Sequence, residues 1–405
     1  MSDVDRVRRP VLLVLASTYP RWIGDPEPGF VHELAKRLTG RFRVLALVPH
    51  APGALDRETL DGVEVVRYRY APEAWETLVN DGGIVTNLRR GKWKVLLVPT
   101  FVLAQAWWVW RLLRRERINV IHAHWLLPQG MVAALLQLLP GRVVPFLATS
   151  HGADLYALRG RAMNALKRFV LRRAGAGTVV SWSMRAVLDA IGADVSKIAV
   201  QPMGVDMHAR FFPDPTVKRS TNEILFVGRL VEKKGLRYLV AAMPAILVAH
   251  PAARLTIAGF GPDEAMLRRQ VEELGLQDRV AFLGAVPQAE LPALYRRAAV
   301  FVAPFVQATS GDQEGLGLVL VEAIGCGCPV IAGDVPAVAD LPVSAVLVSA
   351  ESLATAVGEV LAAPGESIAG AEASRAYCME RFSWDSVAEA YVGILERVSH
   401  GVEHA

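Results

Sequence analysis

Residues 300–329 read VFVAPFVQATSGDQEGLGLVLVEAIGCGCP, and this stretch decides the fold. It opens with an apolar run, Val300–Pro304, which is typical of a buried parallel strand. A polar loop follows, and then an apolar stretch of helical period that stops near Gly325 and Pro329. Strand, loop and helix in this order predict one unit of a doubly wound α/β sheet, in which ligands bind at the carboxyl ends of the strands.

Two glutamates make this loop and helix a candidate ligand site. We place Glu314 in the loop and Glu322 in the helix, so about 12 Å would separate them along a helix axis. That spacing suits a sugar at one end and a ribose at the other, with a diphosphate facing the helix N-terminus between them. Gly315 and Gly317 bracket the first turn and would leave its backbone N–H groups open. The alternative is a core helix with two unrelated glutamates.

The composition is that of a globular protein with two or three domains: 405 residues, 52% of them hydrophobic and 21% charged. Its cysteines, Cys326, Cys328 and Cys378, match neither a disulfide framework nor a zinc motif, which fits a reducing cytosol. The apolar run at residues 11–16 is followed by Tyr19-Pro20 instead of a small-residue cleavage site. We therefore interpret it as a first buried strand and not as a signal peptide.

Charge is divided unevenly along the chain. Residues 1–205 carry 28 Lys and Arg against 16 Asp and Glu, a net charge of +12. The remainder carries 16 against 24, a net charge of −8, and the two sum to the overall +4. The basic half predicts an anionic partner, such as a membrane surface or a phosphorylated acceptor. The sequence contains no basic motif interleaved with aromatic residues, so it does not indicate nucleic-acid binding.

Polar residues stand at the ends of several predicted strands in the first half. Gly24 lies in the loop after the first strand, and His124 ends the strand that begins at Ile118. His151 and Asp154 flank Gly152 directly after another strand. Such positions suit hydroxyl recognition or proton chemistry, although a plain loop and a structural histidine are the alternatives.

The segment 89–117 combines cations with an apolar, tryptophan-rich run. Its apolar part, Val95–Trp110, is shorter than the roughly 20 residues that span a bilayer, and Pro99 interrupts it. Flanking Lys and Arg with several tryptophans favour a segment that lies on anionic lipid. A buried helix with basic ends is the alternative.

The α/β pattern restarts after a linker near residues 201–215. A strand at 223–227 leads into a loop that holds Arg229 and Lys234, which could bind a diphosphate or be solvated surface cations. Later strands end at the glycine turns 259–262 and 284–287. The sequence therefore predicts two doubly wound, Rossmann-like α/β domains that face each other across a ligand-binding cleft.

The ordered set of motifs resembles the retaining glycosyltransferases of family 4, which have the GT-B fold. In the second half the resemblance rests on Gly228-Arg229, Lys234-Gly235, Gly259-Phe260-Gly261-Pro262 and the Glu314–Glu322 pair. In the first half it rests on His122-Ala123-His124-Trp125 and His151-Gly152-Ala153-Asp154. The resemblance implies an acceptor-side domain at 1–205 and a nucleotide-sugar domain at 206–382, with a C-terminal helix at 383–398 that packs back on the first.

The resemblance also implies roles for single residues. Arg229 and Lys234 would stabilise the leaving diphosphate, and Glu322 would bind the ribose. Glu314 would lie near the donor sugar, and backbone groups of Gly315, Leu316 and Gly317 would contact its hydroxyls or phosphate. Gly261 belongs to the donor motif, and Val286 to the segment that would hold the base. His151 would contact the sugar with support from Asp154, and His124 and Gly24 would lie on the acceptor side.

The resemblance implies retention through attack on the face from which the leaving group departs, with double displacement as the alternative. We expect no metal, because Arg229 and Lys234 could neutralise the diphosphate, and no cofactor besides the nucleotide sugar. The first loop departs from the family pattern, since residues 22–29 lack the paired glycines that members often have. Because of this departure, the resemblance supports the role of Gly24 less than the roles of the other residues.

We therefore expect a hexosyltransferase (EC 2.4) that acts on a glycan or lipid-linked acceptor in surface-glycan or exopolysaccharide synthesis. It would be cytoplasmic and peripheral on the inner face of the cytoplasmic membrane. Two rival hypotheses are a sugar-nucleotide 2-epimerase on the same fold and a non-catalytic, membrane-associated partner of a polysaccharide complex.

Overall fold

The computed structural model describes residues 9–25, 29–80, 83–141 and 143–400. The chain divides into two compact units, one of residues 1–202 with 388–405 and one of residues 203–387. The boundary between the two units falls after Pro202, whereas the sequence predicted it after residue 205. The chain returns to the first unit at Ala388, inside the C-terminal helix.

The first unit contains an eight-stranded sheet in the order β3-β4-β2-β1-β5-β6-β7-β8. The strands are β1 Val11–Leu15, β2 Arg43–Pro49, β3 Arg57–Leu60, β4 Val63–Tyr68, β5 Ile118–His124, β6 Phe146–Ser150, β7 Ala176–Val179 and β8 Ile198–Val200. Every neighbouring pair is parallel except β3 and β4. The central strands β1 and β6 are buried along their whole length, which explains their continuous apolar sequence.

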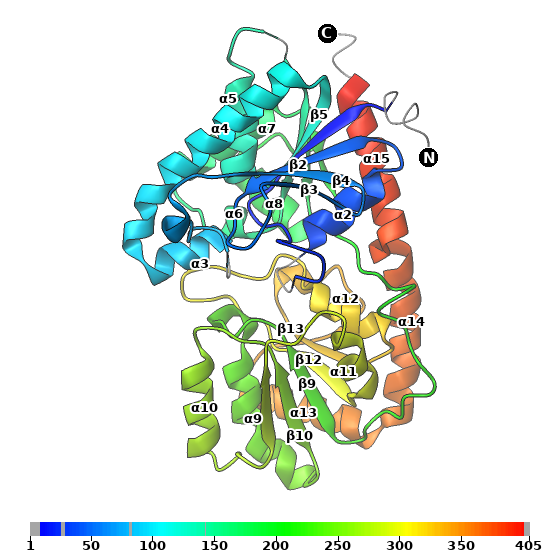
Figure 1. Cartoon of the computed structure of the whole chain (residues 1–405). Coiled ribbons are helices and arrows are strands. Elements are labelled where there is room, and N and C mark those ends of the chain that lie inside the picture. The colour runs from blue at the N-terminus through cyan, green and yellow to red at the C-terminus, as the bar shows by residue number, and fades with distance from the viewer. Residues whose placement is uncertain (1–8, 26–28, 81–82, 142, 401–405) are drawn as a thin grey trace. The chain divides into compact units, whose positions relative to one another are not determined.

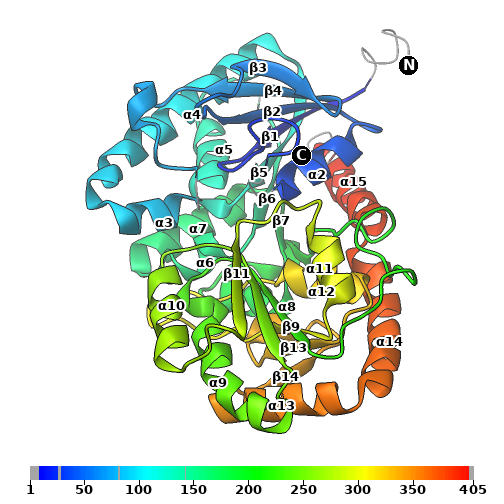
Figure 2. The same cartoon turned by 60° about the horizontal axis from the view of Figure 1, so that its bottom comes forward.

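Helices cover both faces of this sheet. They are α2 Phe30–Leu38, α3 Gly83–Arg90, α4 Leu97–Arg115, α5 Met131–Leu136, α6 Ala153–Tyr156, α7 Arg161–Arg173, α8 Trp182–Ala190 and α15 Trp384–His400, with short helical turns η1 Glu73–Trp75, η2 Lys92–Leu96, η3 Leu126–Gly130 and η4 Val195–Lys197. Both views place α4 and α5 on one face and α2 and α15 on the other (Figures 1 and 2). From α15, Tyr391 donates to the Gln201 carbonyl over 3.2 Å, so the chain's end helps to complete this unit.

The second unit contains a six-stranded, fully parallel sheet in the order β11-β10-β9-β12-β13-β14. The strands are β9 Glu223–Val227, β10 Arg254–Ala258, β11 Val280–Gly284, β12 Val300–Ala303, β13 Val330–Gly333 and β14 Ser344–Val346. The helices are α9 Leu236–Ala249, α10 Glu264–Glu273, α11 Leu291–Arg297, α12 Leu318–Gly325, α13 Ala350–Ala362 and α14 Pro364–Phe382, with η5 Glu232–Lys234 and η6 Pro336–Val338.

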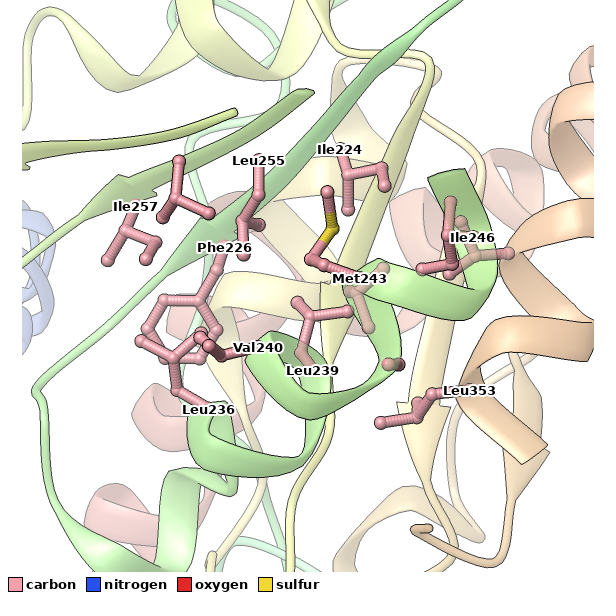
Figure 3. Close-up of a cluster of buried hydrophobic side chains, with 14 of the residues drawn as sticks. Ile224, Phe226, Leu236, Leu239, Val240, Met243, Ile246, Leu255, Ile257 and Leu353 are labelled. Carbon is pink, nitrogen blue, oxygen red and sulfur yellow. The ribbon is translucent and has the colours of Figure 1, made fainter. Parts of the chain in front are cut away.

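The core of the second unit lies between α9, α13 and the central strands. Figure 3 shows Leu239 and Met243 of α9 beside Ile224 and Phe226 of β9, with Leu353 of α13 on the other side of the helix. All five side chains are buried. Burying each large apolar side chain stabilises the fold by about 1.5–3 kcal/mol, so this layer fixes α9 and the loop that precedes it against the sheet.

The strand order of each sheet creates one switch point. In the second unit the chain runs outward from β9 through β10 to β11 and then returns to β12, which pairs with β9. In the first unit the corresponding neighbours are β1 and β5. Successive connections leave in opposite directions at such a point, and the crevice between their loops is where doubly wound sheets bind ligands.

The segment 89–117 combines features of both interpretations of its sequence. One stripe of α4 is buried in the first unit, whereas the opposite stripe exposes Leu103, Trp107 and Trp110. By length and composition alone, Lys92–Arg115 is long and apolar enough to cross a membrane, a criterion that the core helix of a soluble protein also meets.

Glycine at position 235 is expected to be essential for the close packing of the two loops at the β9/β12 switch point. Gly235 has a φ of +66°, and a Cβ there would lie 1.7 Å from the carbonyl oxygen of Pro304. We expect Gly235→Ala to destabilise the protein by about 4 kcal/mol or more, because backbone atoms must move apart. Chemical denaturation would measure the loss.

Gly275 provides the matched control. It has the same φ of +66°, and a Cβ there would meet no atom of the described residues within 4 Å. Gly275→Ala should therefore cost only about 1 kcal/mol, the strain of the left-handed backbone itself. Equal losses in the two variants would contradict the close-packing explanation.

Candidate active site

The switch point of the second unit brings the predicted donor residues onto two neighbouring loops. Arg229 and Lys234 lie in the loop after β9, and Glu314 and Gly315–Gly317 lie in the loop after β12. Hydrogen bonds join these loops, since Val306 N donates to the Lys233 carbonyl over 3.0 Å. The two loops are thus held together at the carboxyl edge of the sheet.

An ion pair between Lys234 and Glu314 lies at the centre of this arrangement. Lys234 Nζ lies 2.7 Å from Glu314 Oε2, and the two side chains are only 13% and 16% exposed. Lys234 Nζ also lies 4.6 Å from the centre of the Phe305 ring. Burial opposes ionisation of Glu314, but the charges of Lys234 and Lys233 outweigh it and lower the pKa of Glu314 to about 2. Glu314 is therefore ionised at neutral pH.

Glu322 lies in a different environment on α12. It accepts hydrogen bonds from Tyr295 Oη over 3.0 Å and from Gln288 Nε2 over 3.2 Å, and it is 7% exposed. Burial raises the pKa of Glu322 to about 7, against the effect of these hydrogen bonds and of the Arg210 charge. The two glutamates thus differ in protonation, and only Glu322 titrates near neutral pH. Carboxylates with separated pKa values at one sheet edge are typical of functional sites.

The helical spacing that we expected between the two glutamates is wrong. Helix α12 begins at Leu318, after Gly317 in the left-handed conformation, so Gly315 and Gly317 precede the helix instead of bracketing its first turn. Only the four steps from Leu318 to Glu322 are helical, about 6 Å of axis. The placement of Glu314 in the loop and Glu322 in the helix is confirmed.

Glycines allow the loops after β9 and β10 to pack backbone against backbone. A Cβ at Gly259 would lie 1.9 Å from the Gly228 carbonyl oxygen, and one at Gly261 would lie 2.3 Å from that of Leu230. Gly259 N also donates to the Gly284 carbonyl over 2.7 Å, at the start of the segment that contains Val286. Gly261 is therefore required by packing, and the structure places Val286 on the adjoining loop after β11.

The carboxyl edge of the first unit's sheet brings the predicted histidines together, beside its switch point. His124 ends β5 and His151 follows β6, and His124 Nδ1 lies 2.9 Å from His151 Nε2. The two ring planes are nearly parallel, with their centres 5.2 Å apart, and the Phe30 ring centre lies 4.9 Å from that of His151. Burial lowers the pKa of His151 to about 3, and the pKa of His124 is lowered well below its usual value. A neutral His151 can donate a hydrogen bond to a hydroxyl group or accept one from it, but it does not supply a proton as an imidazolium.

Asp154 hydrogen-bonds to groups other than His151. Its Oδ2 accepts from Leu126 N and its Oδ1 from Ser150 Oγ, both over 2.7 Å. In the part of the chain that the structure describes, His151 hydrogen-bonds to His124 and not to Asp154. Asp154 therefore holds the backbone that follows β5, and its expected support of His151 in binding the sugar stays a prediction.

Gly24 lies in a tight turn after β1. It has a φ of +83°, and Asp25 N donates to the Trp22 carbonyl over 3.3 Å. The Arg21 guanidinium and the Asp25 carboxylate pair at 2.6 Å across the turn. Residues 26–28 of the predicted loop lie outside the described residues, and the expected acceptor-side role of Gly24 stays a prediction.

Sequence reasoning missed several side chains that shape these two clusters. Tyr295 and Gln288 hydrogen-bond to Glu322, and Lys233 contributes to the low pKa of Glu314. Tyr295 occupies a core position of a helix, and its neighbours in sequence give no sign of a polar partner. Lys233 adjoins Lys234 and was the one that the sequence could have indicated.

Two protein-family models match the chain. The model "Glycosyltransferase Family 4" matches residues 30–209, and "Glycosyl transferases group 1" matches residues 209–365. A GDP-mannose-dependent α-(1-6)-phosphatidylinositol monomannoside mannosyltransferase of Mycobacterium tuberculosis is 34% identical over 263 residues. That alignment covers 60% of this chain and 67% of the relative. The chain belongs to glycosyltransferase family 4.

Other relatives of this glycosyltransferase agree with that assignment. The putative colanic acid biosynthesis glycosyltransferase WcaL of Escherichia coli K12 is 35% identical over 223 residues, 53% of each chain. The enzyme class expected from the sequence, a glycosyltransferase of hexosyltransferase type, is confirmed by these matches.

Solved structures confirm the GT-B fold. Sucrose-phosphate synthase from Thermosynechococcus elongatus superposes with a TM-score of 0.77 at 23% identity, over 97% of this chain and all of the other. Anabaena Alr3699/HepE in complex with UDP and glucose gives a TM-score of 0.71 at 16% identity, over 96% of this chain and all of the other. At such identities the likeness establishes the fold alone.

Within the described ranges, no three His, Cys, Asp or Glu side chains form a cluster that could hold a metal ion. The expectation that this glycosyltransferase needs no metal stays a prediction.

We expect the ionised Glu322 carboxylate to lower the free energy of unfolding of the protein. Its pKa of about 7 in the folded protein exceeds the usual 4.5, so ionising it above pH 7 disfavours folding, and the penalty disappears as the pH falls toward 4.5. Glu322→Gln keeps the shape without the charge. It should be more stable than the parent protein at pH 8 by on the order of 3 kcal/mol, and about equal to it at pH 5.

Denaturant unfolding of both proteins at several pH values would measure this difference. The same variant should lose nucleotide-sugar binding, which separates a functional carboxylate from a structural one. A Glu322→Gln protein that is less stable than the parent at pH 8 would contradict the assignment.

Proposed function

We propose that this glycosyltransferase transfers a hexose-type sugar, with retention, from a nucleoside diphosphate sugar to a glycan or lipid-linked acceptor. The observation that carries the proposal is the pairing of Lys234 with Glu314 on the loops of the switch point, with Glu322 on the adjoining helix. A cation and two carboxylates of different pKa suit a ligand that has phosphates between two groups of hydroxyls.

The proposed reaction breaks the bond between the anomeric carbon and the diphosphate. Lys234 and Arg229 would stabilise the negative charge that develops on the leaving phosphate, and they would take the place of a metal. Glu322 would accept hydrogen bonds from the ribose hydroxyls, and Glu314, released from Lys234, would bind the sugar.

The acceptor hydroxyl would attack on the face from which the diphosphate leaves, and its proton would pass to the leaving phosphate oxygen. His151 would hydrogen-bond a sugar hydroxyl as a neutral imidazole. This role follows from the resemblance, and it agrees with the low pKa of His151.

GDP-mannose is the first donor to test. The mycobacterial relatives are named as GDP-mannose-dependent mannosyltransferases, and the mannosyltransferase alignment spans about two thirds of their length. HepE, which shares only the fold, binds UDP and UDP-glucose. The name of WcaL supports a role in surface-glycan or exopolysaccharide synthesis. We place the enzyme in the cytoplasm, peripheral on the inner face of the cytoplasmic membrane, where segment 89–117 would meet anionic lipid.

Donor binding should stabilise the protein in a way that depends on Glu322. We expect thermal unfolding to shift upward with one nucleotide family among UDP, GDP, ADP and their sugar conjugates. At a hundredfold excess over Kd the gain is about 2.7 kcal/mol, and Glu322→Ala should abolish it. No shift with any nucleotide would contradict the donor site. NMR of the donor without acceptor would reveal epimerisation, and binding without any turnover would favour the non-catalytic partner.

Lys234 should contribute far more to catalysis than its neighbour. Lys234→Ala should lower kcat about 10²- to 10³-fold, because a cation facing the leaving group is removed from a buried site. Lys233→Ala is the matched control, since Lys233 Nζ contacts Asp312 and the Gln313 carbonyl, and its loss should reduce kcat less than about tenfold. Steady-state kinetics of sugar transfer would measure both, and equal effects would exclude the role given to Lys234.

A further inference from the structure

The solvent-exposed side of α4 and of the turn before it is apolar. Leu96 is 73% exposed, Leu103 68%, Trp107 49% and Trp110 36%, and we call these four residues the apolar face. A helix that packs on a domain through one stripe usually presents polar side chains on the opposite stripe. An exposed apolar face of this kind indicates a partner that covers it.

The opposite stripe of α4 belongs to the core of the first unit. Its buried residues are Leu97, Phe101, Gln105, Val109 and Leu112, and α4 packs against α5, β2 and β4. The Phe101 ring lies 5.7 Å from that of Tyr68 and 5.3 Å from that of Tyr70. Because this stripe is packed against protein, α4 is held along the unit and does not cross a bilayer in this fold.

Cations stand at both ends of the apolar face. Lys92 and Lys94 precede it, and Arg111, Arg114 and Arg115 follow or adjoin it, whereas residues 92–115 contain no Asp or Glu. The Arg114 guanidinium lies 4.2 Å from the centre of the Trp110 ring, and that of Arg111 lies 5.2 Å from Trp107. These arginines are thus positioned beside the tryptophans and leave the centre of the face apolar.

We propose that the apolar face docks on an anionic bilayer surface, with α4 lying in the plane of the interface. Tryptophan rings would lie at the level of the headgroups, Leu96 and Leu103 would reach the acyl boundary, and the flanking cations would pair with lipid phosphates. The inference rests on the proposed function in one respect, namely that the bilayer is the cytoplasmic membrane. The sequence predicted that the segment 89–117 contacts lipid, and the proposal assigns that contact to the four side chains of the apolar face.

The charges also decide between lipid and a second copy of the chain. If two apolar faces paired in parallel, Arg114 and Arg115 would meet their own counterparts. If they paired antiparallel, these arginines would meet Lys92 and Lys94. Both arrangements place like charges together, whereas an anionic bilayer attracts every cation of the face.

Vesicle binding of the full-length protein tests the proposal. We would compare phosphatidylcholine vesicles with vesicles that also contain phosphatidylglycerol, at 0.1 M and 1 M salt, where the Debye length falls from about 10 to about 3 Å. We expect binding to prefer anionic vesicles at low salt, with each cation near the surface contributing about fivefold. Leu103→Glu with Trp107→Glu should weaken this binding at least about tenfold, and Arg114→Glu with Arg115→Glu should remove the anionic preference.

Trp182→Glu is the matched control in the same unit. Trp182 is 54% exposed, and Arg185 lies 5.7 Å from its ring, but it stands on α8 outside the apolar face. It should not change vesicle binding. All variants should keep the parent's thermal unfolding and nucleotide-induced shift, which separates loss of docking from loss of the donor site.

Two results would overturn the proposal. One is vesicle binding that the Leu103 and Trp107 substitutions leave unchanged. The other is a dimer in sedimentation velocity that these substitutions convert to a monomer, which would assign the face to a second copy.

Discussion

The ion pair between Lys234 and Glu314 links the two loops at the carboxyl edge of the second unit's sheet, and the arrangement of the candidate site depends on it. It joins the loop after β9 to the loop after β12, and these are the two loops that the strand order forces to leave in opposite directions. A largely buried ion pair stabilises a fold little, because desolvation of the charges offsets their attraction. The ion pair instead holds a cation and a carboxylate, both largely buried, on the two loops where we propose that phosphate and sugar bind.

Glu322 shows how packing sets the chemistry of the same edge. It faces the hydroxyl of Tyr295, a fully buried residue of α11, and the amide of Gln288. No cation forms an ion pair with it among the residues that the structure describes, and burial therefore dominates its pKa. The lysines keep the pKa of Glu314 low, whereas burial raises the pKa of Glu322 to about 7 although its neutral donors oppose the shift. In the function that we propose, this contrast would suit Glu314 and Glu322 to different parts of the nucleotide sugar.

Much of the fold could be predicted because its strands are buried on both faces. Continuous apolar runs such as Val300–Ala303, each followed by a glycine-containing loop, indicate parallel strands and their ligand-binding edge. Edge features were harder to predict. The polar strand β3 is defined only by its antiparallel pairing with β4, and it takes the edge position next to β4 in the sheet.

The site residues that lie in loops were easier to predict than the partners that position them. Arg229, Lys234 and Glu314 follow strands in sequence, so the topology alone brings them together. Tyr295 meets Glu322 only because α11 packs beside α12, a contact that leaves no trace in either segment's pattern. The length of α12 was misjudged for a local reason, since Gly317 adopts a left-handed backbone and starts the helix later than the apolar period suggests. Asp154 was assigned to a histidine, whereas its short side chain reaches the backbone of Leu126.

The C-terminal helix has a consequence for the order in which the protein is made. Tyr391 is fully buried in the first unit, with its ring 5.4 Å from that of His122. The first unit is therefore discontinuous in sequence, whereas the second is one uninterrupted segment, residues 203–387. On the ribosome, the second unit can close its core while the first still lacks part of its own. The first unit can therefore complete its packing only after α15, which follows the second unit in sequence, has also been made.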